Sequence, residues 1–467
     1  MVAKNAMSVE PTGTFLKKAA VATFTSRLRG ELLRAEDDGY EDTRKVWNGM
    51  VDKRPALIVR CAGVDDVVAT VTFAREHDLL VSVRCGGHNI AGKAVCEGGL
   101  MADLSSMRRI RVDRASQTVR VDGGATLGDL DRATQAVGLA TTAGIVSHTG
   151  VGGLTLGGGV GRLARKHGLA CDNLLSAEVV TADGRVVTAS ATENRDLFWG
   201  VRGGGGNFGI VTAFEFRLHP VGPGVLGGKV LHPLSKARAA IKFYDEFARS
   251  APDEVSADAN LLTTPDGHQV FAISVCYAGA MAQGERVLAP LRRFGPPLSD
   301  QIGPMTYTDV QTAADVFFPH GLRYYWKTHF LTEIRDDAID ALVTHFAAVP
   351  SPRSRVAFQQ YGGAASRIGR ADTAFWHRDA QYDLIPTSIW TDPRESDANI
   401  KWVRELWDLT QPFASGGEYV NDLGEDGDDR VRAAYGANYE RLVALKNTYD
   451  PGNFFRLNAN IKPTGCA

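Results

Sequence analysis

The residues best able to do chemistry gather in one glycine-rich stretch, SVRCGGHNIAGKAVCEGG, at positions 82–99. Three kinds of site can be built from it. Residues 87–93 have the G-x-x-x-x-G-K frame of a phosphate-binding P-loop. Cys85, His88 and Cys96 offer three ligands to a metal ion. Alternatively, the glycines bring bare backbone against a cofactor and His88 points at it.

The first two sites lack the sequence context that they require. A P-loop lysine is followed by Ser or Thr and then by a helix, whereas Ala94 follows Lys93 and glycines stand at 98–99. A structural zinc needs four ligands in paired spacing, and no second C-x-x-C or His pair lies nearby. We therefore predict neither a nucleoside triphosphate site nor a metal site.

Glycine is concentrated elsewhere as well: the chain has 50 glycines, and clusters of them at 86–99, 144–161 and 203–209 fall between well-patterned segments. The motif GVGRLA at 159–164 matches G-x-G-x-x-A, but more glycines precede it where a Rossmann motif needs a strand. The loops RCGGHN and SHTGVGG can each present successive backbone N–H groups to an anion such as a pyrophosphate. These loops predict a dinucleotide cofactor held outside a Rossmann fold.

The elements around the loops predict two units. A strand over 54–61, a helix from about 64 and a strand over 79–85 form a β-α-β unit whose exit carries the first loop, and a hairpin turns at 183–184. From 225 the glycine clusters disappear and helices alternate with strands. We predict a cofactor unit over 1–224, a second α+β unit over 225–415, and a segment over 416–467 that returns to the first unit with a helix ending at Pro451.

Composition excludes several classes of protein. A net charge of -2 without any Lys/Arg tract argues against binding to nucleic acid. No apolar run approaches the length of a membrane span, and the first 24 residues lack the apolar core of a signal peptide. The six cysteines are scattered, which is typical of a reduced protein. These features predict a cytoplasmic enzyme, and they leave its oligomeric state open.

Four blocks of the sequence carry a resemblance to a known family: LLVSVRCGGHNIAG, GIVSHTGVGGLTLGGGVGRLARKHGLACDNL, DLFWGVRGGGGNFGIVT and NYERLVALKNTYDPGNFFRLNANI. In this order they resemble the berberine-bridge-enzyme-like FAD-linked oxidases, a branch of the vanillyl-alcohol-oxidase (PCMH-type) flavoproteins. The likeness spans nearly the whole chain and is weakest over 225–415. It implies an α+β, two-domain PCMH-type FAD-binding fold, whose second domain is an antiparallel sheet flanked by helices.

The resemblance also implies how FAD is held. In the family, the histidine at the position of His88 is bonded to the 8α-methyl group of the flavin. The other implied cofactor residues are Arg84, Cys85, Gly86, Gly87, Asn89, Ser147, Thr149, Gly152, Gly153, Val211 and Asn460. Many relatives add a cysteine tether at the position of Val146, and Cys171 is poorly placed to replace it, so a single covalent bond is expected. The small residue Thr149 is compatible with direct reaction with O₂.

The implied reaction passes a hydride from a substrate C–H to flavin N5 while a base removes the proton of the adjacent O–H; O₂ then becomes H₂O₂. The relatives' tyrosine base is replaced here by Asp422 in EYVNDLGED, and a second family tyrosine by Val160. The base is therefore Asp422 or Tyr419, or a residue of the second unit such as Tyr325 or Lys327, which share one face of a strand. Each candidate has a plain structural alternative. The tyrosines can pack in a sheet, and Asp422 can be a solvated acid beside Glu425, Asp426, Asp428 and Asp429.

The sequence constrains the substrate least. An oligosaccharide oxidised at its anomeric carbon fits a tryptophan-rich second unit, with Trp326, Trp376, Trp390 and Trp402 as candidates for stacking. The alternatives are an alkaloid or amine, which needs no strong base, a secondary-metabolite alcohol, or a flavin dehydrogenase with another electron acceptor. In each case the expected partners are a small molecule and, for an oxidase, O₂.

Overall fold

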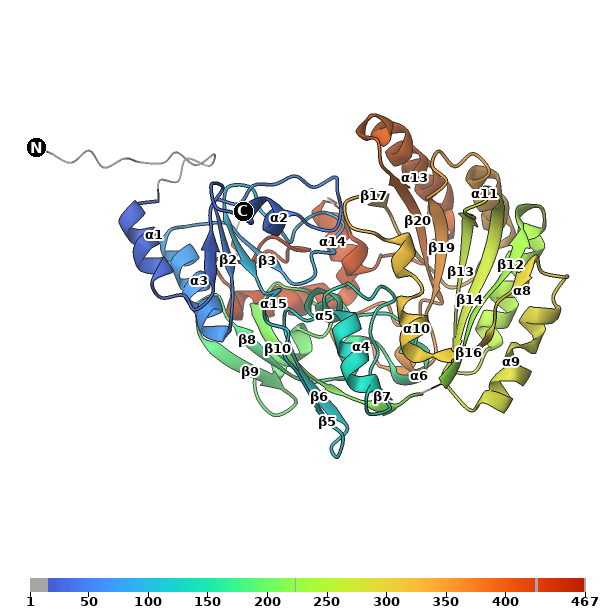
Figure 1. Ribbon diagram of the computed structural model, residues 1–467, viewed down its shortest axis with the longest axis horizontal. Coiled ribbons are helices and arrows are strands. Elements are labelled where there is room, and N and C mark those ends of the chain that lie inside the picture. The colour runs from blue at the N-terminus through green and yellow to red at the C-terminus, as the bar shows by residue number, and fades with distance from the viewer. Residues whose placement is uncertain (1–15, 223, 425–426, 466–467) are drawn as a thin grey trace, which may run out of the picture.

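The computed structural model describes residues 16–222, 224–424 and 427–465. The segment 1–15, part of the stretch judged to lack a signal peptide, lies outside the described residues, as do Glu425, Asp426 and Cys466. The chain forms two units side by side (Figure 1), one built from the first half of the chain and its C-terminal end, the other from the segment between them.

The first unit begins with a four-stranded sheet of order β1-β2-β4-β3. Its elements are α1 (Lys18–Thr25), β1 (Glu31–Leu33), α2 (Tyr40–Arg44), β2 (Leu57–Arg60), α3 (Val64–Glu76), β3 (Val81–Arg84) and β4 (Leu100–Asp103). The predicted β-α-β unit exists, but β4 lies between its two strands and is parallel to both. All four residues of β4 are buried, which is typical of a central strand.

An antiparallel sheet of order β5-β6-β10-β8-β9 completes the first unit. Its strands are β5 (Ile110–Asp113), β6 (Thr118–Asp122), β8 (Leu174–Val180), β9 (Val186–Ser190) and β10 (Ile210–Arg217), and the short β7 (Leu139–Ala140) and β11 (His219–Pro220) pair separately. The helices are α4 (Leu127–Gln135), α5 (Val151–Leu156), α6 (Ala164–His167) and α7 (Arg195–Gly200). The predicted hairpin joins β8 to β9, and Gly184 occupies its turn with a φ of +83°.

The second unit is a nine-stranded antiparallel sheet of order β15-β12-β14-β13-β19-β20-β17, with β16 on β12 and β18 on β20. The strands are β12 (Gly224–Pro233), β13 (Val255–Thr263), β14 (Gln269–Tyr277), β15 (Ser299–Asp300), β16 (Gly303–Thr306), β17 (Arg323–Trp326), β18 (His329–Leu331), β19 (Arg355–Gln360) and β20 (Tyr382–Trp390). The helices are α8 (Ala237–Ser250), α9 (Met281–Arg293), α10 (Tyr307–Thr312), α11 (Asp336–Phe346), α12 (Ala364–Arg367) and α13 (Ser396–Thr410). Helices α8, α9, α11 and α13 cover the outer face of the sheet, and its inner face looks toward the first unit (Figure 1).

The last segment returns to the first unit as α14 (Asp428–Tyr435) and α15 (Tyr439–Tyr449). The prediction of one helix here was wrong, because the helix breaks at Gly436, where φ is +52° and the Trp376 ring leaves no room for a Cβ. Helix α15 stops before Pro451, as predicted. Its Lys446 is buried, donates to the carbonyl oxygens of Asn207 and Phe455, and pairs with Asp450 at 2.6 Å.

Within the described residues, no helix combines the length and the apolar character needed to cross a bilayer.

Candidate functional site

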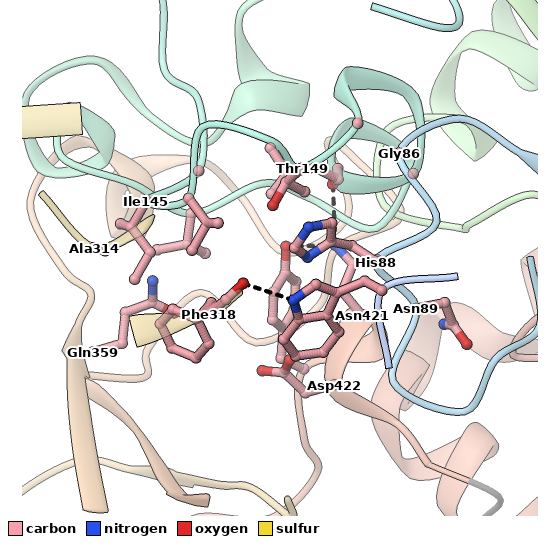
Figure 2. Close-up of a pocket in the computed structure, with 18 of the residues that line it drawn as sticks. Gly86, His88, Asn89, Ile145, Thr149, Ala314, Phe318, Gln359, Asn421 and Asp422 are labelled. Carbon is pink, nitrogen blue, oxygen red and sulfur yellow. Dashed lines mark hydrogen bonds between the residues drawn. The ribbon is translucent and has the colours of Figure 1, made fainter. Parts of the chain in front are cut away.

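A cavity of about 640 Å³ lies between the two units. The glycine loops of the first unit form one wall, the inner face of the second unit's sheet forms the other, and residues 419–422 close it. Figure 2 shows His88, Thr149 and Asp422 around this space, with Phe318 and Gln359 contributed by the second unit. A cleft of this size at a domain boundary is where proteins bind cofactors and substrates.

Glycine is required where the first two loops touch. A Cβ on Gly86 would lie 2.3 Å from the backbone nitrogen of Gly150, and a Cβ on Gly150 would lie 2.3 Å from the sulfur of Cys85. Gly153 and Gly206 line the cavity as these two glycines do, but a Cβ on Gly153 or Gly206 would meet no protein atom within 4 Å. The loops therefore pack tightly on each other and leave open space over their cavity side, which is the shape that an extended cofactor needs.

His88 is held by aromatic neighbours. Its Nε2 lies 2.7 Å from Nδ1 of His148, and its ring stacks on Trp47 with centroids 4.9 Å apart. His320 of the second unit approaches edge-on at 5.7 Å, and the three imidazoles have ligand atoms within 4.8 Å of one another. Burial lowers the pKa of His88, so its ring is neutral and one nitrogen carries a lone pair. Neither His148 nor His320 was predicted from the sequence.

The sulfur ligands first considered for a metal are not gathered around His88. The thiol of Cys85 faces the carbonyl of Ala125 at 3.6 Å, and Cys96 is buried beside Leu80 and Gly99. Val146 lines the cavity, whereas Cys171 is buried away from it.

Most of the residues predicted to bind the cofactor line the cavity: Cys85, Gly86, Gly87, His88, Asn89, Thr149, Gly152, Gly153 and Val211. Three do not. Arg84 donates to the carbonyl of Thr43, and Ser147 donates its backbone N–H to Asp315 at 2.7 Å and its hydroxyl to the same carboxylate. Asn460 does not line the cavity, although the nearby Asn458 and Ala459 do.

Asp422 lines the cavity and is not the solvated loop acid that the sequence left as an alternative. Burial and the nearby Glu418 raise its pKa to about 7. Behind it lies Asp383, wholly buried, whose two carboxyl oxygens have no hydrogen-bond partner within the described part of the chain. Burial and the charge of Asp422 raise the pKa of Asp383 as well, so the two acids compete for ionisation.

Tyr419 also lines the cavity, but its hydroxyl oxygen is engaged. It accepts hydrogen bonds from the backbone N–H of Gly159 at 2.8 Å and from Nδ2 of Asn421 at 2.7 Å. Burial raises the pKa of this phenol. A phenol held in this way supports the glycine loop and is a poor proton acceptor, so Asp422 is the better-placed of the two candidates.

The structure does not bring Tyr325 and Lys327 to the cavity. The hydroxyl of Tyr325 accepts from Arg404 of α13 at 3.1 Å, and the ammonium of Lys327 lies 4.6 Å from the centroid of Trp407. The two residues share a face, as alternation predicts, but that face is covered by α13. Trp326, which lies between them in the sequence, faces the cavity instead.

The other three tryptophans considered for sugar stacking do not line the cavity. Trp376 packs against Gly436, Trp390 donates to Ser396 at 3.2 Å, and Trp402 donates to the carbonyl of His345 at 3.3 Å. Trp326 is the member of the predicted set that remains available to a substrate.

Comparison with known proteins identifies the group to which this geometry belongs. Residues 55–190 match the FAD binding domain family, and residues 418–462 match the family described as berberine and berberine like. An FAD-linked oxidoreductase of Dictyostelium discoideum is 36% identical over 448 residues, which cover 95% of this chain and 97% of the relative. The chain belongs to the berberine-bridge-enzyme-like FAD-linked oxidoreductases.

Solved structures of the berberine-bridge-enzyme-like group agree with this assignment. The 6-hydroxy-D-nicotine oxidase of Arthrobacter nicotinovorans superposes with a TM-score of 0.86 at 30% identity, covering 93% of this chain and 98% of that one. A chitooligosaccharide oxidase shares the fold at 24% identity with a TM-score of 0.84, covering 96% of this chain and all of that one. The predicted family and PCMH-type fold class are confirmed.

The residues present fit FAD. The glycine loops leave an open groove, and Asn458 at the cavity keeps a buried side-chain oxygen without a partner among the described residues. In this berberine-bridge-enzyme-like oxidoreductase, the first-unit loops and Asn458 would hold the cofactor, and Asp422 and the second-unit sheet would face the substrate.

Proposed function

We propose that the protein is an FAD-linked oxidase whose flavin is held by one covalent bond, through the imidazole of His88. The Nε2 of His88 is hydrogen-bonded to His148, and Trp47 stacks on the face of the imidazole. The other ring nitrogen, Nδ1, would form the bond to the cofactor. Val146 offers no thiol at the position where relatives form a second bond, so the proposal includes one tether only.

The observation that carries the reaction is the half-buried carboxyl of Asp422 at the cavity wall. Bound FAD supplies a two-electron acceptor for a hydride from the substrate. Asp422 would accept the proton of the hydroxyl or amine next to the reacting C–H, and a pKa near 7 suits a base that works at neutral pH. Thr149 presents a small side chain to the cavity, which is consistent with O₂ as the final acceptor and H₂O₂ as the product.

For the substrate, we propose a small ring-containing alcohol or amine in preference to the oligosaccharide expected from the sequence. A sugar would find one tryptophan of the four, Trp326, whereas the other three are packed elsewhere. The 32% identity to an (R)-6-hydroxynicotine oxidase of Paenarthrobacter nicotinovorans, over 94% of this chain, supports the same choice.

The tether is tested by precipitating the holoprotein with acid and recording the absorbance of the pellet. We expect a yellow wild-type pellet and a colourless pellet from His88→Ala. His268→Ala, which changes an exposed histidine in a turn of the second unit, should leave the pellet yellow. A colourless wild-type pellet from protein that carried flavin before precipitation would contradict the covalent bond. H₂O₂ release from a panel of alcohols, amines and oligosaccharides tests the oxidase and its substrate class.

A further inference from the structure

Arg355 is a buried cation without a counter-ion. It lies on β19, lines the cavity and is 7% exposed. It forms no ion pair with any residue that the structure describes, and the hydrogen bond from its terminal nitrogen to the carbonyl of Phe317 is long, at 3.4 Å. Its Nε is buried with no acceptor. Other buried cations of this chain are satisfied differently: Arg378 is paired with Asp172, and Arg162 in the cavity wall is paired with Asp258.

Two aromatic rings are the main neighbours of this guanidinium. Its central carbon lies 4.7 Å from the centroid of Phe317 and 4.5 Å from that of Phe318. Ring faces compensate a buried cation only in part, since desolvation of a charge costs more than a cation–π contact returns. Desolvation of the guanidinium accordingly lowers the pKa of Arg355 to about 10.

A second cation lies near the same Phe317 ring. The ammonium of Lys229, on β12, lies 5.7 Å from the Phe317 centroid, and it too lines the cavity without an ion pair in the described structure. Of the two acids in the lining, Asp258 is paired with Arg162, and Asp422 forms no ion pair with Arg355 or Lys229. The second unit's wall therefore carries two positive charges that no described residue neutralises through an ion pair.

We propose that the substrate of this oxidase carries a carboxylate, and that Arg355 binds it with Lys229 as a second cation. A guanidinium binds a carboxylate through paired, charge-assisted hydrogen bonds, and the free Nε–H of Arg355 supplies a donor for one of them. The adjacent rings of Phe317, Phe318 and Trp326 provide an apolar surface for the body of the molecule. The inference rests on the proposed oxidase, since it concerns the substrate of the same cavity, and it makes Arg355 a determinant of specificity.

Binding is tested on the holoenzyme by titrating 4-methylbenzoate and its neutral methyl ester while following the flavin absorbance spectrum. We expect the acid to bind at least about tenfold more tightly than the ester, the factor that one charged hydrogen bond supplies. Arg355→Met should bring the two within about twofold, and Arg355→Lys should retain part of the preference. The control Arg353→Met removes the same charge two residues away, at an exposed position outside the cavity, and should keep the wild-type preference.

Turnover separates this inference from the proposed reaction. 4-(Hydroxymethyl)benzoate and its methyl ester, compared by H₂O₂ release, should show the same preference in kcat/KM. If the acid binds selectively but no alcohol or amine is oxidised, the carboxylate site stands and the proposed oxidase fails. Equal binding of acid and ester, no saturable spectral change with the acid, or an acid preference that survives in Arg355→Met would each overturn the inference. Loss of FAD from Arg355→Met would assign the cation to the cofactor and would also overturn it.

Discussion

Asp422 owes its proposed role to burial beside another acid. An exposed aspartate is ionised throughout the neutral range and is a weak base there, whereas this one titrates near pH 7. Desolvation and the charge of Glu418, which is buried and paired with Arg430, raise the pKa of Asp422. The charge of Asp422 in turn raises the pKa of Asp383, which has no hydrogen-bond partner among the described residues. A proton taken from the substrate would therefore be stabilised on Asp422, because the neighbouring acidic groups disfavour its ionised form.

The pH dependence of turnover reports the ionisation of Asp422. Since Asp422 must be ionised to accept a proton, kcat/KM should rise with pH through about 7 and level off above it. Asp422→Asn should lower kcat by roughly 10²–10⁴-fold, the usual contribution of a general base. Steady-state kinetics from pH 5 to 9 measure both effects.

The comparison variant is Asp429→Asn, an exposed acid of α14, which should leave rate and profile unchanged. A profile without a rise near neutrality, or full activity in Asp422→Asn, would remove Asp422 from the mechanism.

At the scale of elements, the contact between the two glycine loops offers a matched pair of substitutions. Gly150→Ala would place a Cβ 2.3 Å from the sulfur of Cys85 and 2.4 Å from the backbone nitrogen of Gly86, so we expect a loss of about 1–3 kcal/mol in the free energy of unfolding. Gly153→Ala, in α5, meets no protein atom within 4 Å and should unfold no more easily than wild type.

The same pair separates stability from cofactor binding. Because Gly153 borders the cavity, its methyl group would enter the cofactor's groove, and Gly153→Ala should contain less FAD while retaining its melting temperature. Thermal denaturation and the ratio of flavin to protein absorbance are the two measurements. A Gly153→Ala protein with full FAD content would show that the cofactor does not cross this part of α5.

The elements also show what the sequence could predict. Glycine clustering and strand exits identified both loops, the β-α-β unit and the hairpin at 183–184, because these are local properties of the chain. Alternation correctly grouped Tyr325 with Lys327, yet the position of α13 decides which face looks into the cavity, and that is a tertiary contact. His148, Asp383 and Arg355 could not be singled out, since each acquires its role from residues far away in sequence: His88, Asp422 and Phe317.

At the scale of the whole molecule, the cavity exists because two units meet, and polar contacts hold them together. Ser147 of the second glycine loop donates to Asp315 of the second unit, and Arg162 pairs with Asp258. Between α4 and α10, the amide of Gln311 donates to Asp131 at 3.1 Å. Burial raises the pKa of Asp131 to about 7, so this junction between the units is sensitive to pH.

The sign of that sensitivity follows from proton binding. Between about pH 4 and 7 the folded protein keeps the Asp131 proton and the unfolded chain has lost it, so stability falls as pH rises through this range. Asp131→Asn cannot ionise and still offers an oxygen to Gln311. It should match wild type near pH 4 and be more stable at pH 8, by on the order of 2–4 kcal/mol.

Thermal melting of both proteins across this range measures the difference, with flavin-free samples so that cofactor binding does not contribute. A constant difference at all pH values would show that Asp131 does not titrate between these limits.

The return of the chain from the second unit to the first has a consequence for the order of events in the cell. Asn421 and Tyr419 support the glycine loop at 157–159, and Asn458 lines the cavity, although the whole second unit lies between these residues and the loop in the sequence. A nascent polypeptide that has exposed both glycine loops has therefore made only part of the cofactor site. The second unit must be synthesised before the last wall of the cavity can form, so we expect flavin incorporation to follow synthesis of both units.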